Sequence, residues 1–185
     1  MKIAVYSGSF NPLHKGHLAI MKHMTEEAGF DCVYLIVSPK NPLKDSISSD
    51  SGRDRFEAAV KAVERHPELK VKVDDIELRM PEPHYSIRTL DALREREAGN
   101  SFTLIMGADN LADIRRWKDY RRILREHGTA VFPRTGFDLE AIKEDLLSED
   151  GSYRITILDA EMVDISSTQI REAQASGKDI SDWLM

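Results

Sequence analysis

The sequence contains a single cysteine, Cys32, so it cannot form an internal disulfide or a zinc site built on cysteines. Its hydrophobic runs are too short to span a membrane. The N-terminus leads directly into a predicted strand, without the charged and apolar leader of a signal peptide. We therefore expect a cytoplasmic protein with no membrane anchor.

Basic residues are also not in excess. The 26 Lys and Arg residues are outnumbered by 32 Asp and Glu residues, which gives a formal net charge of −6. A protein that binds nucleic acid through general electrostatics carries the opposite balance. We expect no nucleic-acid partner, and any phosphate ligand must be held by local groups against the overall charge.

The remaining composition is that of one ordinary domain spanning residues 1–185, with 41% hydrophobic residues and no internal repeat or linker. Predicted strands and helices alternate along the whole chain, which indicates an α/β fold with an open parallel sheet and helices on both faces. The expected strands are 3–6, 32–37, 71–73, 102–106, 130–132 and 155–158. Residues 76–85 are expected to be irregular, and Ser86 is expected to cap the helix that follows them. The helix capped near Ser51 is expected to bury Phe56, Ala59, Val60 and Val63.

The first predicted strand is followed by a loop that contains two histidines. A helix is expected from about Gly16, and His14 and His17 lie three positions apart at its entrance, where both can face the same way. The first turn of a helix has unpaired backbone N–H groups and the positive end of the dipole, so this loop predicts a phosphate site. Because G-x-G-x-x-G is absent from this turn, a dinucleotide-dependent dehydrogenase is disfavoured.

A second helix start with anion-binding character lies near the other end of the chain. Ser166, Ser167 and Thr168 offer hydroxyls at the expected N-terminus, and Arg171 follows one turn later. Such a segment is also compatible with an ordinary helix cap. Two anion sites at helix starts suit a polyphosphate better than a single phosphate, and both follow the carboxyl ends of strands, where parallel sheets bind ligands.

Several motifs together resemble one enzyme family. Gly8 to His17 reads G-S-F-x-P-x-H-x-G-H and is similar to the nucleotidyltransferase signature G-T-F-x-P-x-H-x-G-H, with Ser9 retaining the hydroxyl of the threonine. Ile165 to Arg171 reads I-S-S-T-x-I-R and resembles the second signature of the adenylyltransferases. With Gly107-Ala-Asp-Asn110 and Trp117, the chain resembles the nicotinate mononucleotide adenylyltransferases from residue 1 to about 177.

This resemblance implies a Rossmann-like fold and the transfer of the adenylyl group of ATP to nicotinate mononucleotide. It also implies catalytic residues that contact the phosphates, an ATP site, and a site for the pyridine nucleotide in which Trp117 stacks on the pyridine ring. The catalytic residues implied are His14, His17, Lys44 and Arg171. The ATP-binding residues implied are Gly8, Ser9, Phe10, Gly16, Arg134, Ser166, Ser167 and Thr168. The acceptor-binding residues implied are Ser86, Thr89, Gly107, Asp109 and Trp117.

Mg²⁺ is expected, held mainly by the ATP phosphates and water, because the sequence shows no carboxylate cluster that would form a dedicated metal site. The attacking phosphate is already an anion at neutral pH, so the reaction needs no general base.

Some alternatives remain open. The segment Asn41 to Lys44 keeps the lysine of the family's P-P-H-K loop and lacks its histidine, and the chain ends before the family's last helix would. These departures leave the acceptor open, so the chain could be a related adenylyl- or cytidylyltransferase that acts on another phosphate acceptor such as phosphopantetheine. It could also be a nucleotide-binding sensor without turnover. Trp117 could be a core residue, and Arg134 could be a solvated arginine. Neither the oligomeric state nor the preference for nicotinate over nicotinamide follows from the sequence.

Overall fold

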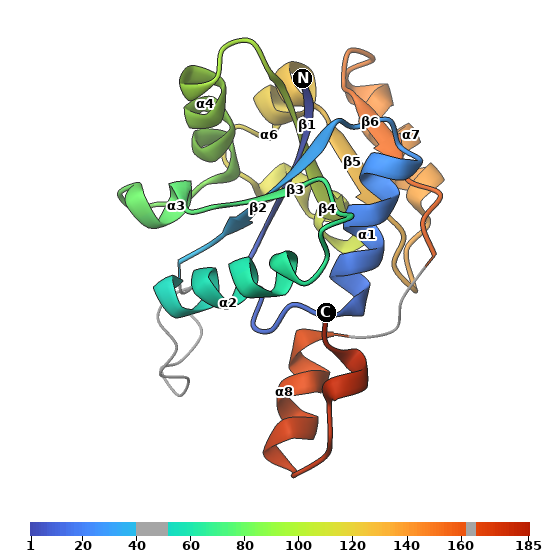
Figure 1. Cartoon of the computed structure of the whole chain (residues 1–185). Coiled ribbons are helices and arrows are strands. Elements are labelled where there is room, and N and C mark those ends of the chain that lie inside the picture. The colour runs from blue at the N-terminus through green and yellow to red at the C-terminus, as the bar shows by residue number, and fades with distance from the viewer. Residues whose placement is uncertain (40–51, 162–165) are drawn as a thin grey trace.

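Six parallel strands form one sheet in the computed structural model, which describes residues 1–39, 52–161 and 166–185 (Figure 1). The order across the sheet is β3-β2-β1-β4-β5-β6. Every neighbouring pair is parallel. The strands are β1 Lys2–Gly8, β2 Cys32–Val37, β3 Val71–Asp74, β4 Ser101–Gly107, β5 Thr129–Phe132 and β6 Ile155–Ile157.

All six predicted strands are therefore confirmed, with ends that differ by one or two residues. The order confirms the expected doubly wound fold, because the chain runs outward from β1 to β3 and then returns to begin again at β4 on the other side of β1. The switch point of this topology lies between the carboxyl ends of β1 and β4.

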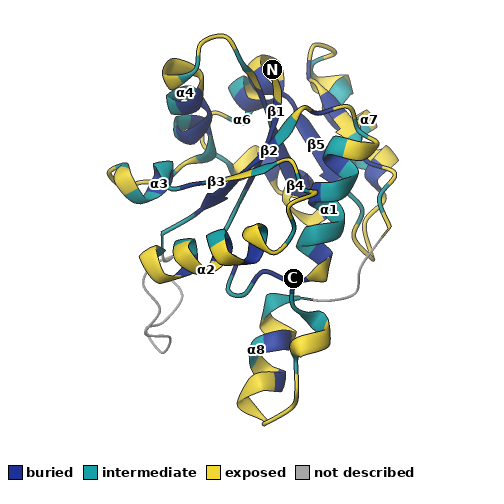
Figure 2. Ribbon diagram, viewed as in Figure 1, coloured by how far each residue is buried: buried dark blue, intermediate teal, exposed yellow. Residues whose placement is uncertain are grey.

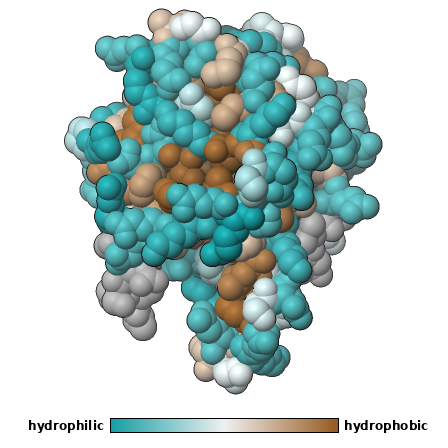
Figure 3. Space-filling view, viewed as in Figure 1, coloured by the Kyte–Doolittle hydropathy of each residue, from teal (hydrophilic) through white to brown (hydrophobic). Residues whose placement is uncertain are grey.

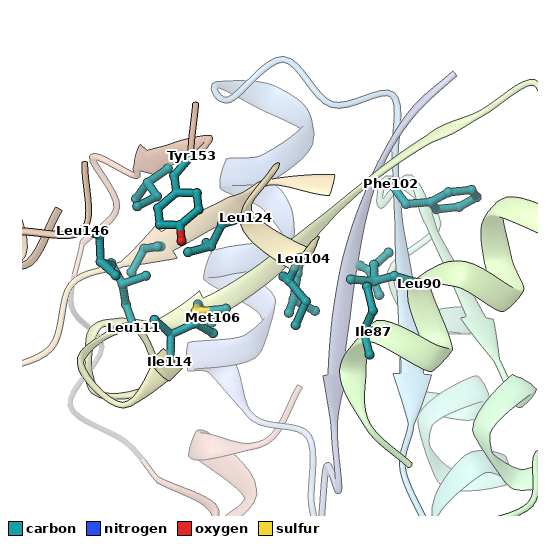
Figure 4. Close-up of a cluster of buried hydrophobic side chains, with 14 of the residues drawn as sticks. Ile87, Leu90, Phe102, Leu104, Met106, Leu111, Ile114, Leu124, Leu146 and Tyr153 are labelled. Atoms are coloured by element: carbon teal, nitrogen blue, oxygen red, sulfur yellow. The ribbon is translucent and has the colours of Figure 1, made fainter. Parts of the chain in front are cut away.

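Helices cover both faces of the sheet and create two apolar cores. On one face, α1 (Lys15–Glu26) and α2 (Gly52–Glu64) pack over Ala4, Val33 and Leu35. On the other face, α4 (Ser86–Arg96), α5 (Ala108–Ala112) and α7 (Leu139–Glu149) contribute to a core that includes Ile87, Leu104 and Leu146 (Figure 4). The four inner strands β2, β1, β4 and β5 are largely buried between these layers (Figure 2), so their near-continuous apolar runs follow from burial on both faces. The edge strands β3 and β6 are partly exposed.

The remaining elements in the described ranges are short. They are α3 Ile76–Arg79, η1 Ile114–Arg116, α6 Tyr120–Arg122, η2 Ile123–His127, α8 Ser167–Ala175 and η3 Ser181–Trp183. None of the helices in these ranges has the length and hydrophobicity needed to cross a bilayer.

Three local predictions were wrong. Residues 76–85 were expected to be irregular, but α3 forms at their start because Asp74 accepts a hydrogen bond from the backbone N–H of Ile76. Ser86 was expected to cap a helix and is instead its first residue. The apolar stripe predicted for α2 is also rotated by about one residue, since its buried positions are Arg55, Ala59 and Ala62. Phe56 and Val63 lie at the flank of that face and are partly buried.

The last helix stands apart from the sheet. Figure 1 shows α8 below the main body, with its first turn close to the start of α1, and the C-terminus at the same place. The backbones of His14 and Leu184 form an isolated antiparallel bridge there.

The surface is mostly hydrophilic in the same view, with an apolar area where the sheet near β3 shows between α1 and α2 (Figure 3).

Candidate active site

The loop after β1 is held in place by a reciprocal cap made from two histidines. Nδ1 of His14, the N-cap residue of α1, accepts a hydrogen bond from the backbone N–H of Gly16 at 3.0 Å. Nδ1 of His17 accepts one from the backbone N–H of His14 at 3.1 Å. The two rings stack with centroids 3.7 Å apart, so the cap fixes both imidazoles side by side at the helix entrance.

These hydrogen bonds determine the protonation of both rings. A ring nitrogen that accepts a hydrogen bond cannot carry a proton, so each neutral imidazole must be protonated at Nε2. Burial lowers the pKa of His14 to about 4, with a further contribution from the charge of Arg134. Burial also lowers the pKa of His17 to about 3, assisted by the charges of His14 and Arg134. At neutral pH the pair therefore offers two Nε2–H donors and no acid or base.

The start of α8 is a second, independent helix N-terminus at the same place. Ser166 forms a capping box with Gln169, in which its hydroxyl accepts from the Gln169 N–H at 3.1 Å. The hydroxyl of Ser167 donates to the carbonyl of Pro12 at 3.0 Å, and the guanidinium of Arg171 donates to the carbonyl of Asn11. These two bonds tie α8 to the histidine loop, although more than 150 residues separate them in the sequence.

A cavity of about 510 Å³ lies where the two helix starts meet the carboxyl ends of the strands. Its lining residues come from β1, α1 and its cap, α5, β5 and the loop after it, the loop after β6, and the start of α8. They are Tyr6, His14, Gly16, His17, Ile20, Asp109, Phe132, Pro133, Arg134, Thr135, Phe137, Glu161, Ser166 and Ser167. The cavity combines helix N-termini and N–H donors with apolar side chains, which suits a ligand with a polyphosphate and an aromatic base.

Arg134 lies at the edge of this cavity. Its Nε is 3.7 Å from Oδ1 of Asp109, and its guanidinium lies over the Phe132 ring, 5.1 Å from the centroid. A Cβ added at Gly107 would lie 2.6 Å from Oδ1 of Asp109 and 3.1 Å from Nε of Arg134. A side chain at the end of β4 would therefore push Asp109 or Arg134 out of the positions in which they meet.

Other residues predicted for the ATP site support the loop without lining the cavity. Phe10 has φ of 46°, is buried and packs edge-on against His17 with ring centroids 5.1 Å apart. A Cβ added at Gly8 would come within 3.2 Å of the Phe10 ring. The carbonyl of Ser9 accepts a hydrogen bond from Arg55, and the hydroxyl of Thr168 accepts one from Arg171 at 3.2 Å.

The residues predicted for the acceptor lie on the opposite face of the sheet from α1. Ser86 and Thr89 are on α4, and Trp117 follows η1 and packs, partly buried, against the core of that face. The Thr89 hydroxyl is buried and donates to the Glu77 carboxylate at 2.9 Å, which also accepts from Ser7 at the end of β1. Two groups of predicted residues thus lie on either side of the strand ends, and Asp109 lies between them. Lys44 lies outside the described residues.

Seven residues that line the cavity were not predicted as site residues from the sequence: Tyr6, Ile20, Phe132, Pro133, Thr135, Phe137 and Glu161. Tyr6 was read only as part of an apolar strand, although its place near the carboxyl end of the central strand is a signal for a site residue. Its ring lies edge-on to His17 at 5.9 Å, and burial raises the pKa of its hydroxyl, which therefore stays protonated. Glu161 follows β6 and has no motif that would have marked it.

Comparison with known proteins agrees with this geometry. Residues 5–173 match the family model described as cytidylyltransferase-like. "Probable nicotinate-nucleotide adenylyltransferase" from Flavobacterium johnsoniae is 39% identical over 184 residues, which cover 100% of this chain and 92% of that protein. The protein of the same name from Bacteroides fragilis is 37% identical, over 99% of this chain and 87% of its own length.

Solved structures show the same fold. The Plasmodium falciparum nicotinic acid mononucleotide adenylyltransferase complexed with NaAD superimposes with a TM-score of 0.75 at 18% identity. The match covers 99% of this chain and 90% of that chain. The same enzyme complexed with APC gives a TM-score of 0.74.

The first prediction concerns the Tyr6 hydroxyl. We expect it to donate to the nucleotide, because it lines the cavity beside His17 and has no hydrogen-bond partner among the described residues. Tyr6→Phe removes one oxygen and keeps the ring packing, so kcat/KM for ATP should fall about tenfold with an unchanged melting temperature. An unaltered kcat/KM would show that the hydroxyl does not reach the ligand.

Proposed function

Because the chain belongs to the nicotinate-nucleotide adenylyltransferases within the cytidylyltransferase-like family, we propose how its residues carry out that reaction. The enzyme transfers the adenylyl group of ATP to nicotinate mononucleotide and releases deamido-NAD and pyrophosphate. The observation that carries the mechanism is the pair of capped helix starts at one cavity, with His14 and His17 both fixed as Nε2–H donors.

In the reaction, a phosphate oxygen of the mononucleotide attacks the α-phosphate of ATP. A bond forms from that oxygen to the α-phosphorus, and the bond from the α-phosphorus to the bridging oxygen of the β-phosphate breaks. The attacking monoester is ionised at neutral pH, since its second pKa is about 6, so no proton has to be removed. Both histidines have a lowered pKa and an Nδ1 that already accepts a backbone N–H, so neither is suited to act as a general base.

The protein's task is to bring two anions together and to stabilise the charge that moves onto the leaving pyrophosphate. We assign this task to the Nε2–H groups of His14 and His17 and to the free N–H groups at the starts of α1 and α8. These donors are already ordered by their caps, so they need no reorganisation when charge develops. Arg134 in the cavity lining and Arg171 beside the histidine loop add positive charge, and Lys44 is proposed to add more.

We place the adenosine part of ATP against the apolar end of the cavity, where Ile20, Phe132 and Phe137 lie. The acceptor is proposed to lie across the strand ends, near Ser86, Asp109 and Trp117. This arrangement sets the two substrates on either side of the switch point, with their phosphates meeting at the histidines. Since both substrates are intracellular metabolites, we propose that the enzyme acts in the cytoplasm.

Mg²⁺ fits this site as a companion of the ATP phosphates. The cavity contains two carboxylates, Asp109 and Glu161, and Asp109 is already paired with Arg134. In the described ranges, the one cluster of three candidate ligands is Asp91, Glu126 and His127, which does not line the cavity and whose carboxylates are held by arginines. Mg²⁺ bound to the phosphates would neutralise part of the charge on the triphosphate.

The second prediction tests the reaction itself. Pyrophosphate release should be measured with ATP and a panel of acceptors: nicotinate mononucleotide, nicotinamide mononucleotide and phosphopantetheine. We expect nicotinate mononucleotide to be preferred over the amide by about tenfold or more, because a hydrogen bond to its carboxylate is charge-assisted. A higher kcat/KM with phosphopantetheine, or ATP binding without pyrophosphate release, would refute the proposal.

The third prediction concerns His17. A donor to the leaving phosphates acts more strongly in the transition state than in the ground state, so His17→Ala should lower kcat about 10²- to 10³-fold with a smaller effect on the KM for ATP. His17→Asn keeps an N–H donor and should recover part of the rate. If both variants were equally inactive while remaining folded, a proton-transfer role would be favoured instead.

The fourth prediction concerns Trp117, which packs partly buried against the core and keeps part of its side chain exposed. Stacking of a base on an aromatic ring is worth about 1–3 kcal/mol, so Trp117→Ala should raise the KM for nicotinate mononucleotide by roughly tenfold. The KM for ATP should change little. An equal increase in both KM values, with a lower melting temperature, would show that the residue serves the core alone.

A further inference from the structure

Arg55 is a buried arginine at a core-facing position of α2. It shares the buried face of that helix with Ala59 and Ala62, and 6% of its surface is exposed. Its Nη1 donates to two backbone carbonyls, those of Ser9 and Ser38, both at 2.8 Å. Ser9 follows the end of β1 and Ser38 follows the end of β2, so one guanidinium nitrogen joins the two strand ends.

Other contacts show how closely these two strand ends are joined. The backbone N–H of Ser38 donates to the carbonyl of Gly8 at 2.9 Å, and the hydroxyls of Ser7 and Ser38 are 3.0 Å apart. Among these contacts between the two strand ends, the one from Arg55 is the contact that reaches Ser9. Arg55 therefore helps to set the position of Ser9 relative to β2.

The carbonyls of the histidine loop share a common arrangement. Ser9, Asn11 and Pro12 accept hydrogen bonds from Arg55, Arg171 and Ser167. None of the three accepting residues lines the cavity. A loop that binds an anion must present N–H groups to the ligand and keep its carbonyl oxygens away, because their partial negative charge repels phosphate. In a helix or a sheet these carbonyls would pair with backbone N–H groups, and here the three side-chain donors take that place.

The energetics favour a functional reason for an arginine here. A core-facing helix position is ordinarily filled by an apolar residue, and a buried guanidinium is costly unless it is fully hydrogen-bonded. The planar, rigid guanidinium holds its two carbonyl partners in a fixed geometry, whereas the ammonium of lysine is a more mobile point charge. The two hydrogen bonds from Nη1 recover part of the cost of burying Arg55, and they fix the backbone of the loop that precedes His14.

We propose that Arg55 is a positioning residue for adenylyl transfer, which holds the loop from Ser9 to His14 so that both imidazoles face the phosphates. This inference rests on the proposed function of the cavity. Arg55 contacts neither substrate and acts through the backbone carbonyl of Ser9. Its loss should move the histidines relative to the helix starts and so affect the rate more than substrate binding.

The test compares Arg55→Lys and Arg55→Met with Arg53→Met as the matched control. Arg53 lies on the same helix, 60% exposed, and its guanidinium pairs with Asp75 and Glu57. Because a small misplacement of reacting groups costs up to about 10² in rate, we expect both Arg55 variants to lower kcat by about ten- to a hundredfold. The KM for ATP should rise less than kcat falls, and Arg53→Met should retain the wild-type kcat.

A rescue experiment separates positioning from loss of folding. Arg55→Ala should recover part of its kcat when millimolar guanidinium chloride is added, because the free ion can occupy the place of the lost group. Rates should be measured well below the melting temperature of each variant. Recovery in Arg55→Ala with no gain in the wild type supports the proposal.

Three results would overturn the proposal. The first is a wild-type kcat in Arg55→Lys, and the second is an equal loss of kcat in Arg53→Met. The third is a loss of kcat in the Arg55 variants that guanidinium does not reverse and that equals the fraction of each variant that is unfolded.

If the wild-type protein released no pyrophosphate, the proposed function would fail instead. Binding of inorganic pyrophosphate would then test the loop alone, and unchanged affinity in Arg55→Met would exclude the positioning role.

Discussion

The active site depends on the requirement that backbone N–H groups at the start of a helix find partners. In α1 two of these groups are satisfied by the Nδ1 atoms of His14 and His17. This use of the imidazoles as helix caps has a chemical consequence, because it leaves each ring with its proton on Nε2. The same interaction that begins the helix therefore creates two neutral donors beside the remaining free N–H groups of its first turn.

The surrounding structure keeps this arrangement in place. Phe10 packs behind His17, and the first turn of α8 is tied to the loop through Ser167 and Arg171. The second helix start is thus held against the first, although the two segments are at opposite ends of the chain. In the proposed mechanism, a protein with a net charge of −6 binds a triphosphate at this point because both helix starts direct N–H groups to one cavity.

Much of this architecture could be predicted from the sequence, and the rest could not, for identifiable reasons. The inner strands were found because burial on both faces makes each of them a short apolar run, and β3 was found because Val71 and Val73 alternate with lysines. The histidine loop was found because its residues are contiguous. The position of Arg55 was missed because the two carbonyls that it binds belong to loops that only the fold brings together. Tyr6 was missed because an apolar strand pattern does not show which residue of the strand reaches the cavity. The binding role of each residue assigned to the ATP and acceptor sites remains a prediction. Only the folded chain shows that these residues form two groups on either side of the strand ends.

The claim on which this account depends is that both histidines are neutral and carry their proton on Nε2 before any substrate binds. Long-range ¹H–¹⁵N NMR correlation of histidine-labelled protein reads this state directly, and spectra of His14→Asn and His17→Asn would assign the two rings among the six histidines of the chain. We expect both rings to appear as the neutral Nε2–H form at pH 7 and to remain so down to about pH 5, because burial lowers both pKa values below the usual 6.5. A charged imidazolium at pH 7, or a ring protonated at Nδ1, would contradict the proposed cap and the mechanism derived from it.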